Sequence, residues 1–494
     1  MPSLVILAPT GRAIATGAAV VDPAPQQTMQ GFGVSGAWWT IDMPDFPKAA
    51  QKHIAQMLFT NKGIALSQYR YNIGGGGVGV TVPTGGESER GPKNRAPDTF
   101  YQGNGVYDWS KDPGGTTFLR YADKYHVSDI TGFVDSAPPQ FTTNGQSCGG
   151  ALRSGSEQAF ADYLVTVVTH VHDVWHTTIG HVSPMNEPDY TRSDCTQEGM
   201  QVPPKQRATV VQHVGEGLAA QAPYSSVIAD ESSSVGTQFD PEVPQWMNVP
   251  GTSQYAAALA HHTYDLPSVT ALQQAGAIAQ SYAKPLWMTE SCCVVTTSSG
   301  LRSGIGYDPT ITGGVAMADL IARDLTQAND AAWDWWVALS AAMGCNPVRN
   351  PACPQQKNDQ GWNDGLIEYD PNYGSDHNYS LYPTKRFWAL GNFSKFVRPG
   401  AVRHNVSGAP TNLDVMAFQS RKSWQVLVIN DDSVGAPSTA LHLNLPRQIR
   451  LHAAGAFQTS ATDDLASVPD PTLTSTGMTT WIPAQSVTTF LLQE

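Results

Sequence analysis

The sequence predicts an α/β fold, a (β/α)8 TIM barrel with an attached β-sandwich domain built from the C-terminal strands plus an N-terminal strand. Three observations support this prediction. Eight short apolar or β-rich runs alternate with helix-length amphipathic segments, which is the pattern of a closed parallel barrel. After residue 396 short strand-like runs follow one another with only turn residues between them, which is typical of a sandwich. A further strand-like segment precedes residue 28.

The eight barrel runs place the barrel at residues 29–396. Between them, a helix is predicted to start at an N-capping Ser156 and to run to about Trp175. Another is predicted over residues 313–328, where apolar residues recur at helical spacing. The predicted barrel strands are residues 30–35, 65–72, 130–136, 180–187, 226–231, 258–265, 284–290 and 332–339.

The side domain is expected to unite both chain ends, with residues 1–28 joining residues 397–494. Two long connections, 74–116 and 340–383, follow the second and eighth barrel strands. Long loops at the carboxyl face of a barrel usually build substrate subsites. The predicted sandwich strands are residues 402–406, 413–419, 424–430, 440–445 and 488–492.

Two of the barrel runs stop at a glutamate, in the segments HVSPMNEP (181–188) and PLWMTES (285–291). A buried strand that delivers a carboxylate at its carboxyl end is how such barrels build active sites. Two such carboxylates, here Glu187 and Glu290, are what retaining glycoside hydrolysis requires, one as acid/base and one as nucleophile. The amide of Asn186 could bind a sugar hydroxyl beside the scissile bond. The alternative, that both glutamates are exposed loop residues, fits the strand pattern less well.

Other strand ends supply suitable partners for these two glutamates. Arg70 and Tyr264 could keep a nucleophilic carboxylate ionised by charge and by hydrogen bonding. Trp335 could form a stacking floor for a sugar ring. An acid/base must carry a proton, so we expect the pKa of Glu187 to be raised by the charge of Glu290 and by apolar walls.

Composition and motifs exclude several other functions. The net charge of −13 disfavours nucleic acid and anionic membranes as partners. The chain has no stretch of 18 apolar residues that could span a membrane. His261 and His262 are neighbours on one strand and point to opposite faces, so we expect no metal site there. The GxSxG motif of serine hydrolases is missing from the sequence. We therefore expect a monomeric enzyme without metal or cofactor, whose partner is a polysaccharide or oligosaccharide.

The six cysteines suggest an oxidising environment. Cys345 and Cys353 bracket a short Pro-rich loop and predict a local disulfide. Cys148 and Cys195 follow predicted strands and could staple two loops. The adjacent Cys292 and Cys293 could form a disulfide or remain two buried thiols.

Secretion and glycosylation are further expectations from the sequence. Residues 1–8 are apolar but lack the basic segment of a signal peptide, so secretion is inferred from the cysteines rather than from a leader. Three N-glycosylation sequons begin at Asn378, Asn392 and Asn405. They are compatible with a secreted glycoprotein.

Seven segments together resemble glycoside hydrolase family 30 of clan A: QGFGVSGAWW, YRYNIGGGG, SPMNEP, HHTYD, WMTESC, DWWVAL and ALGNFSKFVRPGA. The resemblance implies a barrel with a side β-sandwich that uses both chain termini. It also implies that Glu187 is the acid/base and Glu290 the nucleophile. The candidate substrate-binding residues are Arg70, Asn186, Tyr264, Trp335, Trp336 and Trp39.

Within that family, the segments GAWW and GWNDGLIEYDPNY are most similar to the endo-β-1,6-galactanase group. This resemblance implies cleavage of β-1,6-galactosidic linkages in arabinogalactan side chains by double displacement. The alternatives are the same mechanism on β-1,6-glucan or xylan, and a catalytically inactive carbohydrate-binding barrel. A glucuronoxylanase would need a basic patch for the uronate, and the loops of the eighth strand are poor in arginine.

Overall fold

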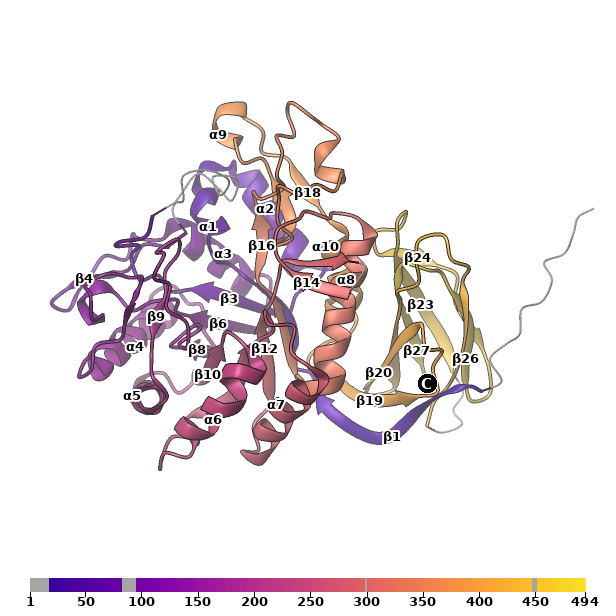
Figure 1. The fold of residues 1–494 in the computed structure, drawn as a ribbon, viewed down its shortest axis with the longest axis horizontal. Coiled ribbons are helices and arrows are strands. Elements are labelled where there is room, and N and C mark those ends of the chain that lie inside the picture. Colours follow the sequence, from indigo (N-terminus) through magenta and orange to yellow (C-terminus); the bar gives the residue numbers. More distant parts are fainter. Residues whose placement is uncertain (1–16, 82–94, 298–299, 447–450) are drawn as a thin grey trace, which may run out of the picture.

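The computed structural model describes residues 17–81, 95–297, 300–446 and 451–494. A barrel and a strand-rich side domain lie next to each other, and the long strand β1 (Ala19–Thr28) runs beneath the helices from one to the other (Figure 1). Among the described residues, no helix is long and apolar enough to cross a bilayer. Residues 1–16, which include the apolar N-terminal segment, lie outside the described residues.

Eight parallel strands close the barrel, which confirms the predicted fold class. Their order around the barrel follows the chain, so each strand pairs with the next one in the sequence. The strands are β2 (Gly31–Ser35), β3 (Gln68–Asn72), β6 (Asp129–Phe133), β8 (His181–Ser183), β10 (Ser226–Ser232), β11 (Ala256–His262), β12 (Leu286–Glu290) and β15 (Ala332–Trp335).

One long helix follows each barrel strand, as the alternating pattern of the sequence predicted. Two of them begin at a side-chain cap, because Asp112 accepts a hydrogen bond from the Gly115 amide and Ser268 from the Ala271 amide. The helices are α2 (Lys48–Phe59), α3 (Pro113–Lys124), α4 (Glu157–Asp173), α5 (Pro204–Gln221), α6 (Asp240–Met247), α7 (Val269–Ser281), α8 (Ile311–Arg323) and α10 (Lys385–Ser394).

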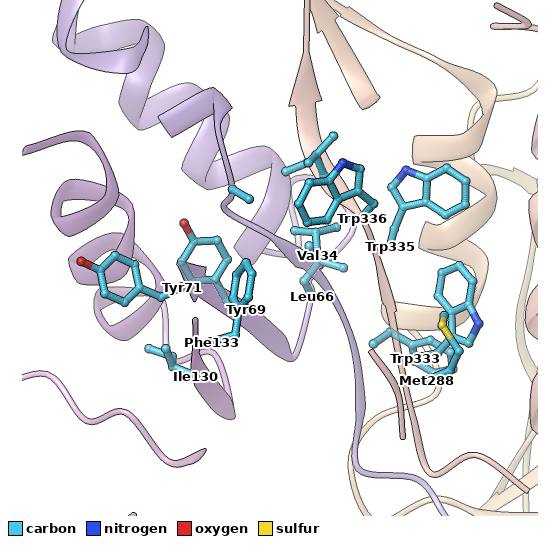
Figure 2. Close-up of a cluster of buried hydrophobic side chains, with 14 of the residues drawn as sticks. Val34, Leu66, Tyr69, Tyr71, Ile130, Phe133, Met288, Trp333, Trp335 and Trp336 are labelled. Carbon is cyan, nitrogen blue, oxygen red and sulfur yellow. The ribbon is translucent and has the colours of Figure 1, made fainter. Parts of the chain in front are cut away.

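Aromatic side chains pack mainly between the barrel strands and the surrounding helices, where Tyr69 contacts Phe59 of α2 and the indole N–H of Trp333 donates to Asp324 after α8. Figure 2 shows Tyr69, Tyr71 and Phe133 on one side of this cluster and Trp333 and Trp335 across from them. All five are almost fully buried. Buried apolar contacts therefore hold the helices to the outside of the barrel.

The ten strands of the side domain are hydrogen-bonded into one sheet, which folds around a hydrophobic core of its own. In the order, β1 lies between β19 (Val402–Ser407) and β22 (Thr439–Asn444), antiparallel to the first and parallel to the second. The expected pairing of the N-terminal strand with the C-terminal strands is thus confirmed for β1. The other strands are β20 (Leu413–Ser420), β21 (Ser423–Asn430), β23 (His452–Thr459), β24 (Ala466–Val468), β25 (Thr472–Leu473), β26 (Gly477–Ile482) and β27 (Ser486–Gln493).

Two predicted barrel strands end earlier than expected. Strand β8 stops at Ser183 because Pro184 has no N–H to continue the ladder, so Glu187 lies in the following loop with a φ of 45°. The run 332–339 divides at Trp336. Its second half is β16 (Val337–Ser340), which joins β17 (Gly365–Tyr369) and β18 (Leu381–Pro383) in a separate sheet.

The loops at the carboxyl ends of the barrel strands carry further short elements. These elements include three two-stranded sheets. The pairs are β4 (Tyr101–Gly103) with β5 (Val106–Tyr107), β7 (Gly150–Ala151) with β9 (Met200–Gln201), and β13 (Val294–Thr297) with β14 (Gly300–Ser303); two short helices are α1 (Trp39–Asp42) and α9 (Tyr373–Asp376).

All six cysteines are paired. The predicted Cys345–Cys353 disulfide is confirmed, and Cys148–Cys195 staples the loop after β6 to the loop after β8. The pair left open by the sequence, Cys292 and Cys293, forms a disulfide between adjacent residues.

One of the three glycosylation sequons is excluded by burial. Asn392 is fully buried in α10, and its side-chain amide donates to the Phe457 carbonyl at 3.1 Å and to the Thr489 hydroxyl at 3.1 Å. A glycan cannot be accommodated there, so the predicted N-glycosylation at Asn392 is wrong. Asn405 is exposed on β19, and Asn378 is half-buried.

Candidate active site

A cavity of about 490 Å³ opens at the carboxyl ends of the barrel strands, and both Glu187 and Glu290 line it. Nearly all of its wall comes from the loops that follow the strands. Other lining residues are Trp38, Arg95, Tyr190, Arg192, Tyr264, Cys292, Cys293, Trp336, Trp362 and Asp364.

Glu290 is held at both carboxylate oxygens. It ends β12, where Arg70 Nη1 donates to Oε2 at 2.9 Å and the Tyr264 hydroxyl donates to Oε1 at 2.8 Å. Arg70 is fully buried in the middle of β3. Burial raises the pKa of the Tyr264 hydroxyl, and the charge of Glu290 adds to the shift. The tyrosine is therefore a hydrogen-bond donor at neutral pH. The structure brings together the three residues that the sequence had grouped.

A backbone hydrogen bond fixes the position of Glu187, and two basic side chains contact its carboxylate. Its amide donates to the Glu231 carbonyl at 3.0 Å. Its carboxylate accepts a hydrogen bond from Arg192 Nη2 and lies 3.4 Å from His262 Nδ1. Burial alone would raise the pKa of Glu187, but the charges of Arg192 and His262 outweigh it and lower this pKa to about 2. The expected raised pKa of Glu187 is therefore wrong.

Glu231 is a third buried glutamate beneath the other two. It lies at the end of β10, where its Oε2 accepts hydrogen bonds from Arg70 Nη2 at 2.6 Å and from the Thr289 hydroxyl at 3.0 Å. His262 Nε2 approaches the same oxygen at 3.0 Å. Although burial raises the pKa of Glu231, Arg70 and His262 bring it down to about 2. This glutamate is a fixed negative charge that anchors both cations.

His262 lies at the centre of the three glutamates. Burial lowers its pKa, but the charges of Glu290 and Glu231 and the hydrogen bonds to Glu187 and Glu231 raise it to about 10. His262 is thus positively charged at neutral pH. Three cationic side chains, His262, Arg70 and Arg192, therefore contact the three buried glutamates.

Asn186 is oriented by hydrogen bonds at both ends of its amide. Its Oδ1 accepts from Arg70 Nη2 at 3.3 Å, and its Nδ2 donates to Asp135 Oδ1 at 3.1 Å. Asn72 Nδ2 donates to the other oxygen of Asp135 at 2.5 Å. Burial is the main cause that raises the pKa of Asp135 to about 7. The network fixes which way the Asn186 amide points before a ligand arrives.

Trp336 lines the cavity, and Trp335 does not. Trp335 is fully buried, and its indole N–H donates to the Asp364 carbonyl at 2.6 Å. Trp336 lines the cavity at the point where the strand ends. Adjacent residues of an extended chain point to opposite sides, so only one of the two indoles can face the ligand. The expected stacking floor at Trp335 is replaced by Trp336.

Trp38 and Trp39 differ in the same way: Trp38 lines the cavity, and Trp39, the residue predicted to bind substrate, does not. Trp39 is buried, donates to the Ser35 carbonyl at 3.1 Å and packs edge-on against Phe118 at 4.5 Å. Trp38 lines the cavity and meets Trp336 edge-on at 5.0 Å. Trp39 therefore belongs to the core, and its predicted contact with substrate is not supported.

Four residues of the site were missed or assigned no role from the sequence. Glu231 and Asp135 lie at the ends of predicted strands, so the rule that selected Glu187 and Glu290 selects them too. His262 was considered only as a metal ligand. Arg192 lies in a loop of irregular sequence, and nothing in its neighbourhood predicts contact with Glu187.

Comparison with known proteins supports the barrel and its chemistry. Residues 18–343 match the family described as O-Glycosyl hydrolase family 30. A Bacillus subtilis protein named glucuronoxylanase XynC is 24% identical over 361 residues, which cover 71% of this chain and 70% of the relative. A Bifidobacterium longum exo-β-1,6-galactobiohydrolase is 26% identical over 178 residues, 29% of this chain and 12% of the relative.

Solved structures show the same fold. The catalytic domain of a family 30 xylanase from Talaromyces cellulolyticus superimposes with a TM-score of 0.70 at 21% identity, covering 97% of this chain and all of that domain. The family match extends over most of the barrel and includes Glu187 and Glu290. The chain therefore belongs to glycoside hydrolase family 30.

Proposed function

We propose that this protein is a retaining glycoside hydrolase that cleaves β-1,6-galactosidic linkages, with Glu290 as nucleophile and Glu187 as acid/base. The observation that carries the proposal is the spacing of the two carboxyl groups. Glu187, His262 and Glu290 each present an atom within 4.8 Å of the others. Retaining enzymes have carboxyl groups about 5–5.5 Å apart, whereas inverting enzymes need roughly 6.5–9.5 Å to admit a water.

The contacts of Glu290 suit nucleophilic attack on an anomeric carbon. Arg70 and Tyr264 hold its two oxygens in place, so little reorganisation precedes formation of the glycosyl–enzyme bond. The leaving-group oxygen takes a proton from Glu187 in this step. In the second step Glu187 removes a proton from water, and the water displaces the sugar from Glu290.

Glu187 cannot donate a proton while Arg192 and His262 keep it ionised. Because Arg192 lines the cavity, an entering saccharide displaces the guanidinium from Glu187. Loss of this ion pair raises the pKa of Glu187 toward the value that an acid catalyst needs. Arg192 therefore sets the pH at which the free enzyme becomes active.

Exchange of Arg192 for glutamine is expected to shift the alkaline limb of the kcat/KM profile to higher pH by about one unit or more, since the neighbouring positive charge that depresses the pKa of Glu187 is gone. The measurement is kcat/KM on a soluble oligosaccharide between pH 3 and 9. Arg192→Lys retains the charge and should keep the limb near its wild-type position. An Arg192→Gln profile that coincides with that of the wild type would contradict this account of Glu187.

The preference for β-1,6-galactan is supported by two segments of the cavity wall. The segment GAWW contributes Trp38, and the segment GWNDGLIEYDPNY contributes Trp362 and Asp364. Both segments are those that resemble the galactanase group. The Bifidobacterium relative is named for the same linkage. The Bacillus relative favours xylan as a second candidate substrate.

A panel of β-1,6-galactan, β-1,6-glucan, β-1,3-galactan and xylan tests the proposal. We expect β-1,6-galactan to be cleaved fastest, with the β-anomer appearing first in proton NMR spectra. Faster cleavage of xylan would assign the site to the second candidate. No cleavage of any member, together with binding to one of them, would identify an inactive carbohydrate-binding barrel.

Secretion and a monomeric state belong to the same proposal. Three disulfides are stable in an oxidising compartment. A solved relative of the fold, from Bacteroides fragilis, is described as a conserved exported protein. A secreted enzyme of this kind would meet its polysaccharide outside the cell.

A further inference from the structure

The disulfide between the adjacent residues Cys292 and Cys293 lies in the wall of the active-site cavity. Only Ser291 separates it from Glu290 at the end of β12. Both cysteines line the cavity together with Glu187 and Glu290. Cys292 is 4% exposed, and Cys293 is half-buried. The disulfide is therefore close enough to the reacting centre to contact a bound sugar.

The backbone around the disulfide connects two walls of the cavity. Cys293 has a φ of 62°, its amide donates to the Asn363 carbonyl at 3.3 Å, and its carbonyl accepts from the Gly304 amide at 3.0 Å. The neighbours of Asn363 in the chain, Trp362 and Asp364, also line the cavity. The disulfide thus belongs to a turn that is held to the Trp362 loop and to the β13–β14 hairpin.

The other two disulfides have different surroundings. Neither Cys345 nor Cys353 lines the active-site cavity, and Cys353 packs with Tyr307 and Met343 in a separate cluster. Cys148 and Cys195 join two loops and also lie outside the cavity lining. Only the Cys292–Cys293 pair combines covalent closure with a place in the cavity wall, among the three disulfides of the chain.

We propose that the Cys292–Cys293 disulfide is a substrate-contacting surface that determines affinity for the saccharide beside Glu290. The inference rests on the proposed glycosidase function. Sulfur is polarisable and weakly hydrogen bonding, so a closed disulfide offers an apolar face to the C–H surface of a pyranose ring. The disulfide ring also fixes the shape of this face, so little conformational entropy is lost when the sugar binds.

Reduction would remove this surface. A dithiol reagent attacks one sulfur, the S–S bond breaks, and two electrons and two protons convert the pair into two thiols while the reagent becomes a cyclic disulfide. The two cysteine side chains are then free to adopt separate rotamers. The apolar face is lost, whereas Glu290 keeps its hydrogen bonds to Arg70 and Tyr264.

The test compares the double variants Cys292→Ala/Cys293→Ala and Cys345→Ala/Cys353→Ala with the wild type on β-1,6-galactan. If that polysaccharide is not cleaved, the best substrate of the panel replaces it. We expect KM to rise about tenfold in the first variant, the equivalent of a lost contact, with kcat within about threefold of the wild type. The Cys345→Ala/Cys353→Ala control should keep the wild-type KM.

Dithiothreitol provides a second measurement that does not depend on folding of a variant. The reagent should raise KM of the wild type and leave KM of Cys292→Ala/Cys293→Ala unchanged. An unchanged KM in both experiments would overturn the inference, and so would a fall in kcat alone, because that result would assign the disulfide to placement of Glu290. A wild type that cleaves no member of the panel would instead refute the proposed function.

Discussion

Exchange of Glu290 for alanine is expected to abolish turnover of every substrate, with a loss of at least about 10⁴-fold in kcat. The reason is that no other carboxylate can form the glycosyl–enzyme bond. Glu231 lies close by but is fully buried, and it is engaged by Arg70, Thr289 and His262. The measurement is the initial rate on β-1,6-galactan, with thermal unfolding as the check that the variant is folded.

Azide should rescue the Glu290→Ala variant on an aryl β-galactoside by direct attack in the space left by the carboxylate. A single displacement inverts the anomeric carbon, so the product is the α-galactosyl azide. Recovery of the β-azide would contradict the role proposed for Glu290. Wild-type enzyme with azide serves as the control and should form no α-azide.

Exchange of Glu187 for alanine is expected to slow cleavage of natural linkages by about 10²–10⁴-fold, the usual contribution of general acid–base catalysis. The loss should be much smaller for the first step on an aryl β-galactoside with an acidic phenol, because that leaving group needs no proton. The glycosyl–enzyme should then accumulate, since general-base assistance to water is missing too. A burst of phenol followed by a slow steady state is the expected signal.

Azide should also rescue Glu187→Ala, but through the accumulated intermediate. Two successive displacements retain the configuration, so the product is the β-galactosyl azide. The α-anomer from this variant, together with the β-anomer from Glu290→Ala, would exchange the two proposed roles. Intact-protein mass spectrometry would show the accumulated intermediate on Glu290 independently of the azide.

The barrel was predictable because its eight strands are short apolar runs of regular spacing, and their pairing follows the order of the chain. The side domain was less so. Strands β23 to β26 alternate polar and apolar residues only weakly, and β24 and β25 have three and two residues, so no apolar run marks them in the sequence. Strand β8 ends early because of a single residue, Pro184, and the pattern of apolar residues gives no sign of this end.

The site was predictable where a side chain lies on a barrel strand, as for Arg70 on β3 and Glu290 at the end of β12. It was not predictable where a loop brings a side chain back over the barrel, as for Arg192. The predicted rise in the pKa of Glu187 was wrong because of Arg192. This residue is only five positions away in the sequence, but the path of the loop is what brings it into contact with the carboxylate. The choice between Trp335 and Trp336 depends on where β15 ends, which sequence patterns leave uncertain by a residue.

The position of β1 in the side domain has a consequence for biosynthesis. The ribosome makes β1 before the barrel, but its partner β19 begins only at Val402, after the whole barrel has been made. The barrel can thus fold during translation, as N-terminal parts of a chain generally do, while β1 waits unpaired at its base. During that interval β1 exposes its hydrogen-bonding edges, which β19 and β22 cover only after they have been made.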